Sequence, residues 1–430
     1  MDASFLTNSA LDFLPLGAKI LPKRIYLNTT QQVIRNKVLI LHVDPKLKPH
    51  WSEKESIPVF IPNLYKSVVG DVLAFFEDPL TKQQYPALVK VNNSFIFNFD
   101  PKETIDFLTA EKYVRKHKPL QSKLPFHYHK IPFRFYVGKV QSKLYSLRKK
   151  EALFPSWPFE YSVEFIRALF SYCTSQLQKN KATEIWPKHK KIAFCLTHDV
   201  DTGQGLKRVK PFADLEAKHD FSTTWFFVGK YYPHNHTFLQ QLVDQGNEIG
   251  CHGYNHDGKL AYLPPHKIKE RLNACLPFIQ RYNITGFRTP SMISSETLSN
   301  ILPSYFSYES SYADTELVSP DANNRGSCTL FPYYKNNFLQ IPHTLPMDST
   351  LLFLGYTPQQ ILSAWIEKLE LIKRIGGLAL LDTHTEPHFS GQPKMIPIYK
   401  QFLDVLESQK KEMWMPTVGE LANHWKKKFN

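Results

Sequence analysis

Cysteine is scarce in this chain, and its distribution gives no basis for a disulfide framework. The five cysteines are odd in number, follow no regular spacing and are absent from the first 172 residues. Small secreted domains that depend on disulfides instead carry dense sets of paired cysteines. We therefore expect reduced thiols, as in a cytoplasmic protein.

Long apolar runs are missing as well. No stretch of about 18 consecutive apolar residues occurs, so the sequence predicts no transmembrane helix. The segment 1–19 carries Asp2 and Asp12 where a secretory signal has basic residues, and Asn, Ser and Pro interrupt its apolar stretches. These absences predict a cytoplasmic location.

Positive charge is abundant but unevenly distributed. The formal net charge is +14, and residues 101–150 hold thirteen Lys or Arg against three Asp or Glu, a difference of +10. Aromatic residues lie among the basic ones in the segment 102–150, a pattern typical of surfaces that follow an anionic polymer or a membrane. A solvated face of a linker and helix has the same composition, and the segment contains no clear nucleic-acid motif.

The length of 430 residues suggests two or three domains. Residues 1–150 are predicted to form an N-terminal α/β or β-rich module of unknown role. Prolines within 154–158 break any helix there, and residues 151–190 are expected to form a connecting helix and a linker. The predicted elements are strands at 32–42, 58–62, 71–76 and 87–99, with a hairpin turn at Asn92-Asn93, and a helix at 160–178.

Residues 191–430 alternate regularly between short apolar segments and longer amphipathic ones. This alternation predicts parallel strands joined by helices, and seven strands in about 200 residues suggest that the sheet closes into a barrel. Strands are expected at 192–198, 222–229, 247–252, 284–289, 305–312, 338–343 and 377–383. Helices are expected at 207–219, 235–246, 265–282, 294–302, 358–374, 396–410 and 417–427.

Polar residues follow these strands directly, where barrel enzymes place their chemistry. Asp199 and Asp201 stand two residues apart at the end of the first strand, so their side chains share one face. His252 and His256 follow the third strand at a spacing of four, which brings two imidazoles to one cation if the segment turns helically. Two histidines and one carboxylate leave positions open for water and substrate, which is typical of a catalytic metal site.

Four segments appear in a fixed order along this region. They are Thr197-His198-Asp199-Val200-Asp201, Ser222-Thr223-Thr224-Trp225-Phe226-Phe227-Val228-Gly229, His252-x3-His256 and Arg288-Thr289-Pro290. Together they resemble the polysaccharide deacetylase family, the NodB-homology domain of family 4 carbohydrate esterases, over about 191–415. The resemblance implies a distorted (β/α)7–8 barrel that uses one divalent metal ion, expected to be Zn²⁺. It further implies the removal of acetyl groups from N-acetylated sugars of a glycan or glycan precursor.

The resemblance also implies the residues that hold the metal ion and move the first proton. Asp201, His252 and His256 would be the ligands. Asp199 would be the general base that activates water, and Arg288 would pair with Asp199 and keep it ionised.

The remaining roles fall on two later segments. The backbone N–H of Ser291, which follows Pro290, would stabilise the oxyanion. His384, at the end of the seventh strand, would protonate the leaving amine, and Asp314 is a candidate partner for that histidine.

Two departures from the family pattern leave alternatives open. The usual first motif has adjacent carboxylates, but Val200 separates them here, so either Asp199 or Asp201 can be the ligand, and we favour Asp201. The usual last motif reads Leu-x-His, and here Asp382 replaces the leucine before His384.

Two other functions compete with deacetylation. One is that of a related barrel amidohydrolase that cleaves another C–N bond, such as a cyclic or formyl amide. The other is that of a catalytically silent glycan-binding protein whose basic N-terminal half carries the role. The sequence retains the whole set of acid, base and metal-binding residues, and this favours an enzyme.

Overall fold

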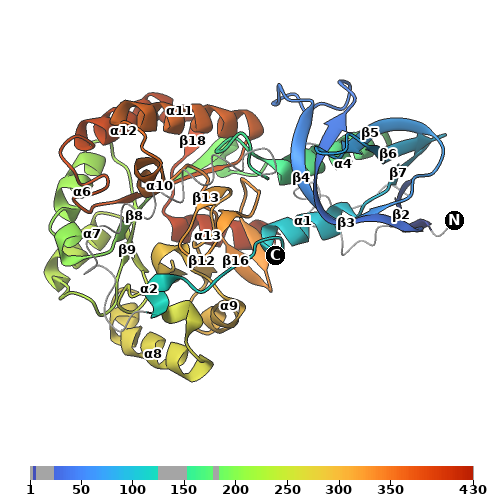
Figure 1. Ribbon diagram of the computed structural model, residues 1–430. Helices are drawn as coiled ribbons and strands as arrows, with labels where there is room; N and C mark the ends of the chain where they lie inside the picture. The colour runs from blue at the N-terminus through green and yellow to red at the C-terminus, as the bar shows by residue number, and fades with distance from the viewer. Residues whose placement is uncertain (1–2, 6–23, 124–152, 178–183, 430) are drawn as a thin grey trace.

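The computed structural model describes residues 3–5, 24–123, 153–177 and 184–429 (Figure 1). Within these ranges, the N-terminal part is a seven-stranded sheet in the order β1-β2-β7-β6-β5-β3-β4. Adjacent strands in this sheet are antiparallel, except for β2 and β7, which run parallel to each other. The strands are β1 Ala3–Phe5, β2 Ile25–Asn28, β3 Gln32–Val43, β4 Ser56–Tyr65, β5 Asp71–Glu77, β6 Gln84–Val91 and β7 Ser94–Phe97.

Alternating side chains explain why this sheet has a buried face. In β4, Ile57, Val59 and Ile61 are fully buried, whereas the residues between them are half-buried, as the period of two in a strand requires. The predicted hairpin joins β6 to β7 at Asn92-Asn93, where Asn92 adopts a φ of 52°. Asparagine tolerates this left-handed conformation well, so the turn follows from the sequence.

Two helices pack against this sheet. Helix α1, Pro101–Thr109, begins after Asp100, whose side chain accepts hydrogen bonds from the backbone N–H groups of Lys102 and Glu103. Helix α4, Ser162–Leu177, lies within the predicted range, and ring contacts such as Phe97–Phe170 at 5.9 Å join it to the sheet. A short helix, α2 Leu120–Lys123, follows α1.

The second large sheet contains all seven strands that the alternation predicted. Its order is β15-β16-β12-β11-β10-β9-β8-β17, with β18 also paired to β8. The predicted strands are parallel to their neighbours, and β15 is antiparallel to β16. The bounds are β8 Ile192–Val200, β9 Thr224–Phe227, β10 Glu248–Cys251, β11 Gly286–Phe287, β12 Tyr308–Glu309, β15 Tyr333–Lys335, β16 Phe338–Gln340, β17 Leu378–His384 and β18 Met413–Trp414.

The two ends of this sheet meet without regular strand pairing. The backbone N–H groups of Thr344 and Leu345 donate to the carbonyl of Leu380 in β17, at 3.2 and 3.0 Å, and so join the chain after β16 to the last strand. The predicted distorted (β/α) barrel is therefore confirmed. Its helices are α5 Gly203–Leu206, α6 Val209–Ala217, α7 His236–Asp244, α8 Pro265–Arg281, α9 Glu296–Ile301, α10 Asp348–Phe353, α11 Pro358–Ile375, α12 Ile396–Gln409 and α13 Val418–Phe429. A small hairpin of β13 Glu316–Val318 and β14 Asn323–Arg325 lies outside the main sheet.

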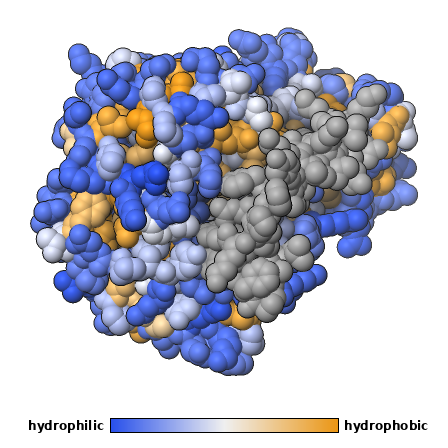
Figure 2. Space-filling model, turned by 60° about the vertical axis from the view of Figure 1, so that its left-hand side comes forward, coloured by the Kyte–Doolittle hydropathy of each residue, from blue (hydrophilic) through white to orange (hydrophobic). Residues whose placement is uncertain are grey.

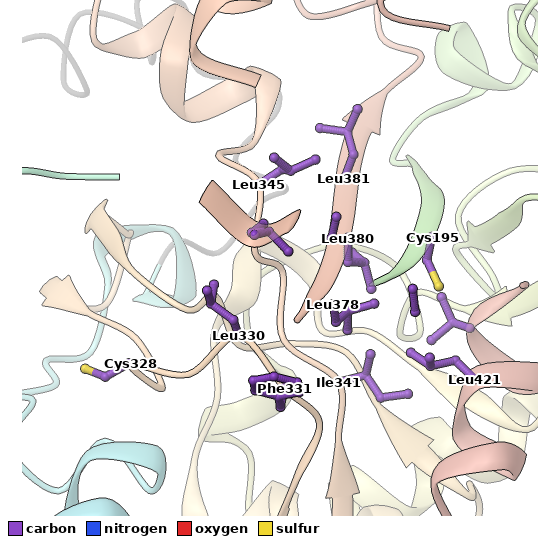
Figure 3. Close-up of a cluster of buried hydrophobic side chains, with 14 of the residues drawn as sticks. Cys195, Cys328, Leu330, Phe331, Ile341, Leu345, Leu378, Leu380, Leu381 and Leu421 are labelled. Atoms are coloured by element: carbon purple, nitrogen blue, oxygen red, sulfur yellow. The ribbon is translucent and has the colours of Figure 1, made fainter. Parts of the chain in front are cut away.

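A dense apolar core fixes the barrel strands. All nine residues of β8 and all seven of β17 are buried, as expected for parallel strands covered on both faces. Figure 3 shows Leu378, Leu380 and Leu381 of β17 close to Cys195 of β8. Rigid strands of this kind can hold polar side chains at their ends.

Several predictions fall outside the described residues. Most of the basic segment 102–150 does so, because residues 124–152 are not described, and the domain boundaries at 150 and 190 stay predictions. Among the described residues, no helix is long and apolar enough to cross a membrane. The face in Figure 2 is mostly hydrophilic, with apolar residues scattered over it. The predicted cytoplasmic location is not tested by these observations.

Truncating a core side chain should destabilise the barrel. Leu380 is fully buried, so Leu380→Ala should lower the free energy of unfolding by about 2–5 kcal/mol, through lost burial and the cavity left behind. Urea denaturation would measure the change. The matched variant is Leu80→Ala, since Leu80 is 63% exposed, and it should change stability by less than about 0.5 kcal/mol. Equal effects at the two positions would contradict this account of the core.

Candidate active site

The carboxyl ends of four parallel strands, β8, β10, β11 and β17, bring the predicted polar residues to one edge of the barrel. In the register of the sheet, His384 of β17 lies opposite Asp199 of β8. Strands β9, β10 and β11 follow β8 in spatial order, and His252 and Arg288 come directly after the last two. Residues more than 180 positions apart in sequence therefore meet at this edge.

Asp201, His252 and His256 form a compact trio of buried donors. The Nε2 atoms of His252 and His256 lie 3.3 and 3.0 Å from Oδ1 of Asp201, and the two imidazole centroids are 5.1 Å apart. The Nδ1 atom of His252 lies 3.1 Å from the carbonyl oxygen of Arg288, to which it donates in the tautomer that leaves Nε2 as an acceptor.

Two atoms of this trio have no hydrogen-bond partner although they are buried: Oδ1 of Asp201 and Nε2 of His252. Buried polar atoms normally find a partner, and these two converge with His256 on one point. One carboxylate oxygen and two imidazole nitrogens are also the donor set of a catalytic divalent metal site. The residues therefore fit the metal ion that their spacing predicted.

The chain does not bring the two histidines together in the predicted way. Residues 252–258 form bends and not a helical turn. The reversal instead uses left-handed backbone at Gly253, with a φ of 70°, and at His256, with a φ of 53°. A β-carbon at position 253 would lie 2.9 Å from Cδ of Pro290, so glycine is needed for conformation and for space.

Arg288 is the hub of the second group of side chains. Its Nη1 donates to Oδ1 of Asp199 at 2.8 Å and to Oδ1 of Asp382 at 2.7 Å. Its Nε and Nη2 donate to the carbonyl and hydroxyl oxygens of Ser310, and its guanidinium lies 4.0 Å from the ring centroid of Phe226. The predicted pairing of Arg288 with Asp199 is thus present, in a side chain with no solvent exposure.

Asp382, which replaces the usual leucine, is a second carboxylate on this guanidinium. Burial raises the pKa of Asp382 to about 7 against the lowering effect of Arg288, and the negative charge of Asp199 adds to the rise. Its Oδ2 has no hydrogen-bond partner and lies 3.8 Å from Nδ1 of His343. The departure from the family pattern therefore places an extra titratable group beside Asp199.

His384 pairs with a residue that the sequence did not indicate. Its Nδ1 lies 2.8 Å from Oδ1 of Asp348, and Oδ2 of Asp348 accepts from the backbone N–H groups of His384 and Ser390. Burial alone would lower the pKa of His384, but Asp348 outweighs burial, and the pKa lies well above its usual range. The suggested partner, Asp314, is wrong: it forms an ion pair with Lys368 at 2.7 Å.

Glu386 is another buried carboxyl that sequence reasoning missed. Its Oε1 accepts from the backbone N–H of Thr202 at 2.9 Å, whereas Oε2 has no partner. Burial and the neighbouring charge of Asp201 raise the pKa of Glu386 well above its usual range. A spacing of two from His384 on an extended strand end was the available signal, because such residues share a face.

A solvent-open cleft of about 270 Å³ adjoins His256. Its lining comes from two segments of the chain, residues 254–258 with Leu260 and Ala261, and Thr289 with Pro290 and Ile293. Pro290, which precedes the predicted oxyanion donor Ser291, is among the lining residues. Ser291, the next residue, has a φ of 57° and lies within the tight turn Pro290–Met292.

Two other histidines, His198 and His343, are buried. His198 is fully buried, stacks on Trp225 at 4.0 Å and lies 2.7 Å from Oε1 of Glu216, as a packed core residue should. The Nε2 atom of His343 lies 2.8 Å from the carbonyl oxygen of Ser310, which also accepts from Nε of Arg288.

Comparisons with known proteins agree with these observations. Residues 188–304 match the family model described as polysaccharide deacetylase. A peptidoglycan deacetylase of Helicobacter pylori is 19% identical over 241 residues, which cover 50% of this chain and 82% of that protein.

Two solved structures match a little over half of the chain. A polysaccharide deacetylase from Mycobacterium smegmatis is 20% identical with a TM-score of 0.45, and an allantoinase is 15% identical with a TM-score of 0.48. Each match covers 57% of this chain and 94% of the other.

The family model covers the first metal-site segment, the two histidines and the Arg-Thr-Pro segment, which are the motifs on which the resemblance rested. The family consists of metal-dependent deacetylases, so the expectation of a hydrolase that acts on C–N bonds other than peptide bonds is confirmed. The barrel of this chain is therefore similar to the polysaccharide deacetylase family, whose model matches residues 188–304.

Proposed function

We propose that this chain hydrolyses the N-acetyl groups of amino sugars in a glycan or glycan precursor, with one Zn²⁺ ion as its cofactor. The observation that carries the proposal is the convergence of three groups at one barrel edge. These are the donor trio, the Asp199–Arg288 pair and the His384–Asp348 pair. They correspond to metal binding, a general base and a general acid.

Asp201, His252 and His256 would hold the ion. A divalent ion at this position supplies Lewis-acid polarisation of the acetyl carbonyl and lowers the pKa of water. Two imidazoles and one carboxylate suit zinc, which accepts nitrogen and oxygen ligands with an open position. The hydrogen bond of His252 to the carbonyl of Arg288 fixes the ring orientation that such a ligand needs.

Asp199 is placed to remove a proton from water. Its Oδ1 is held by Arg288, and its Oδ2 lies 3.5 Å from Nε2 of His252, on the side of the donor trio. The hydrogen bond from Arg288 fixes the orientation of this carboxylate. The geometry therefore supports the assignment favoured from the sequence, with Asp199 as the base and Asp201 as the ligand.

His384 is placed to return a proton to the leaving amine. Asp348 binds Nδ1, so the opposite nitrogen is the one available to a substrate, and the side chain keeps 11% exposure. The raised pKa keeps the imidazole protonated, as a general acid requires. The backbone N–H of Ser291, beside Pro290 in the cleft, would donate to the developing oxyanion.

Loss of the histidines should abolish metal binding. Purified protein should contain about one divalent ion per chain, and His252→Ala or His256→Ala should reduce this to near zero, because two ligands remain. Elemental analysis after dialysis measures the content. His236→Ala, an exposed histidine on α7, is the control and should keep the ion. Full metal content in the two site variants would remove the assignment.

Acetate release across a panel of chitin oligomers, peptidoglycan fragments and nucleotide-linked acetamido sugars tests the function. Asp199→Asn should keep the metal ion but lower turnover of any accepted substrate by about 10²–10⁴-fold, since it removes the base. Asp214→Asn on the exposed face of α6 should leave turnover unchanged. Release from no acetylated sugar, with hydrolysis of a formyl or cyclic amide, would contradict the proposal.

The pH profile should depend on Asp348. Because His384 must be protonated to act as the acid, the alkaline limb of kcat follows its pKa, which Asp348 raises. Asp348→Asn should lower that pKa and move the alkaline limb to lower pH. Steady-state kinetics over pH would measure the shift, and an unchanged limb would exclude His384 as the acid.

A further inference from the structure

The segment 111–118, which follows α1, runs across the barrel toward α2 (Figure 1). The backbone N–H of His117 donates to the carbonyl of Asp321 at 2.8 Å, and its carbonyl accepts from the hydroxyl of Tyr262 at 3.1 Å. Nζ of Lys116 donates to Oγ of Ser294 at 2.7 Å. The segment therefore contacts the neighbours of residues that line the cleft, since Tyr262 follows Ala261 and Ser294 follows Ile293.

A buried two-point ion pair anchors this segment. Nε and Nη2 of Arg325, in β14, donate to the two carboxylate oxygens of Glu111 at 3.0 and 2.7 Å. Arg325 also pairs with Asp321, and Lys116 lies 3.1 Å from Oε2 of Glu111. Burial alone would raise the pKa of Glu111, but Arg325 and Lys116 lower it to about 2. The carboxylate is therefore charged, and the guanidinium is fixed by its planar fork.

The same guanidinium holds the turn after Pro290. Nη1 of Arg325 donates to the carbonyl of Met292 at 2.9 Å, and Nη2 donates to Oγ of Ser294 at 3.2 Å. Ser291 and Met292 have φ angles of 57° and 58°, a region that residues other than glycine seldom adopt. Such conformations persist only where surrounding contacts impose them. The hydrogen bond from Arg325 to the carbonyl of Met292 is one such contact.

We propose that Glu111 and Arg325 are positioning residues for deacetylation, which hold the 290–294 turn so that the Ser291 N–H faces the reacting carbonyl. This inference rests on the proposed function. The two residues act through the turn and not on the substrate. The N-terminal half of the chain thereby takes part in the reaction through one buried carboxylate.

The decisive variant is Arg325→Lys, which keeps a cation beside Glu111 and Asp321 but loses the fork that reaches Met292. Hydrogen exchange of the amides in 290–295 should become about tenfold faster, since a charge-assisted hydrogen bond is lost. With the substrate found in the panel, kcat should fall about 10–100-fold while KM and metal content stay near the wild-type values. Exchange is measured by mass spectrometry and does not require activity.

Arg167→Lys is the matched control. Arg167 on α4 is also buried and pairs with Glu164 at 3.2 Å and with Thr329 at 3.3 Å, and neither partner belongs to the turn. The control should leave both the exchange of 290–295 and kcat unchanged. Equal changes in the two variants would mean a general loss of stability and would overturn the proposal.

Two further outcomes keep the tests separate. If Arg325→Lys does not fold, Lys116→Met decides, because this lysine also bonds Ser294 and Glu111, and unchanged exchange there would overturn the proposal. If the wild-type chain releases no acetate, the proposed function fails. Faster exchange in Arg325→Lys alone would then still support the holding of the turn, and unchanged exchange would refute it.

Discussion

The constraint on which the site depends is a guanidinium buried without solvent. Arg288 cannot lose its charge, so the fold has to surround it with acceptors, and it does so with Asp199, Asp382, the two oxygens of Ser310 and the face of Phe226. These partners come from β8, β9, β17 and the chain after β12, so one side chain ties together the ends of strands that are distant in sequence. Two carboxylates share its Nη1, and they differ in their surroundings. Asp199, at the end of β8, faces the donor trio, whereas Asp382, deeper in β17, has a pKa raised to about 7.

Much of the barrel follows from local pattern. All seven strands and seven helices appear near their predicted ranges, because short apolar runs between amphipathic segments have few other arrangements. The lengths were less predictable: β11 and β12 have two residues each, although their apolar runs are longer. A run of apolar residues indicates burial, whereas a strand also requires hydrogen-bonded neighbours in register, which the run alone does not specify. The N-terminal sheet followed from alternation in the same way, but its strand order depends on contacts between distant segments, which no local pattern encodes.

The site divides along the same line. Asp199, Asp201, His252, His256 and Arg288 were predictable because each stands at a strand end within a recognisable motif. Asp348 was not, since it begins a helix and reaches His384 only through the folding of the chain, and its sequence surroundings resemble those of any helix start. Glu386 was missed although its spacing of two from His384 offered a signal. The choice of Asp314 failed because a nearby lysine on α11, distant in sequence, neutralises it. The spacing of the two histidines led to the right pair by the wrong route, because Gly253 and the left-handed backbone of His256 replace the expected helical turn.

The pair of Glu111 and Arg325 has a consequence for how such a chain can change over generations. Removal of one partner leaves the other as a buried, uncompensated charge, which typically costs about 3–5 kcal/mol, a large part of the stability of an ordinary domain. Neither the N-terminal half nor the barrel can therefore vary freely at its own side of the contact, although 214 positions separate the two residues. The two halves are therefore expected to change together. A barrel without its own N-terminal half would keep Arg325 as a buried cation that has lost the carboxylate of Glu111.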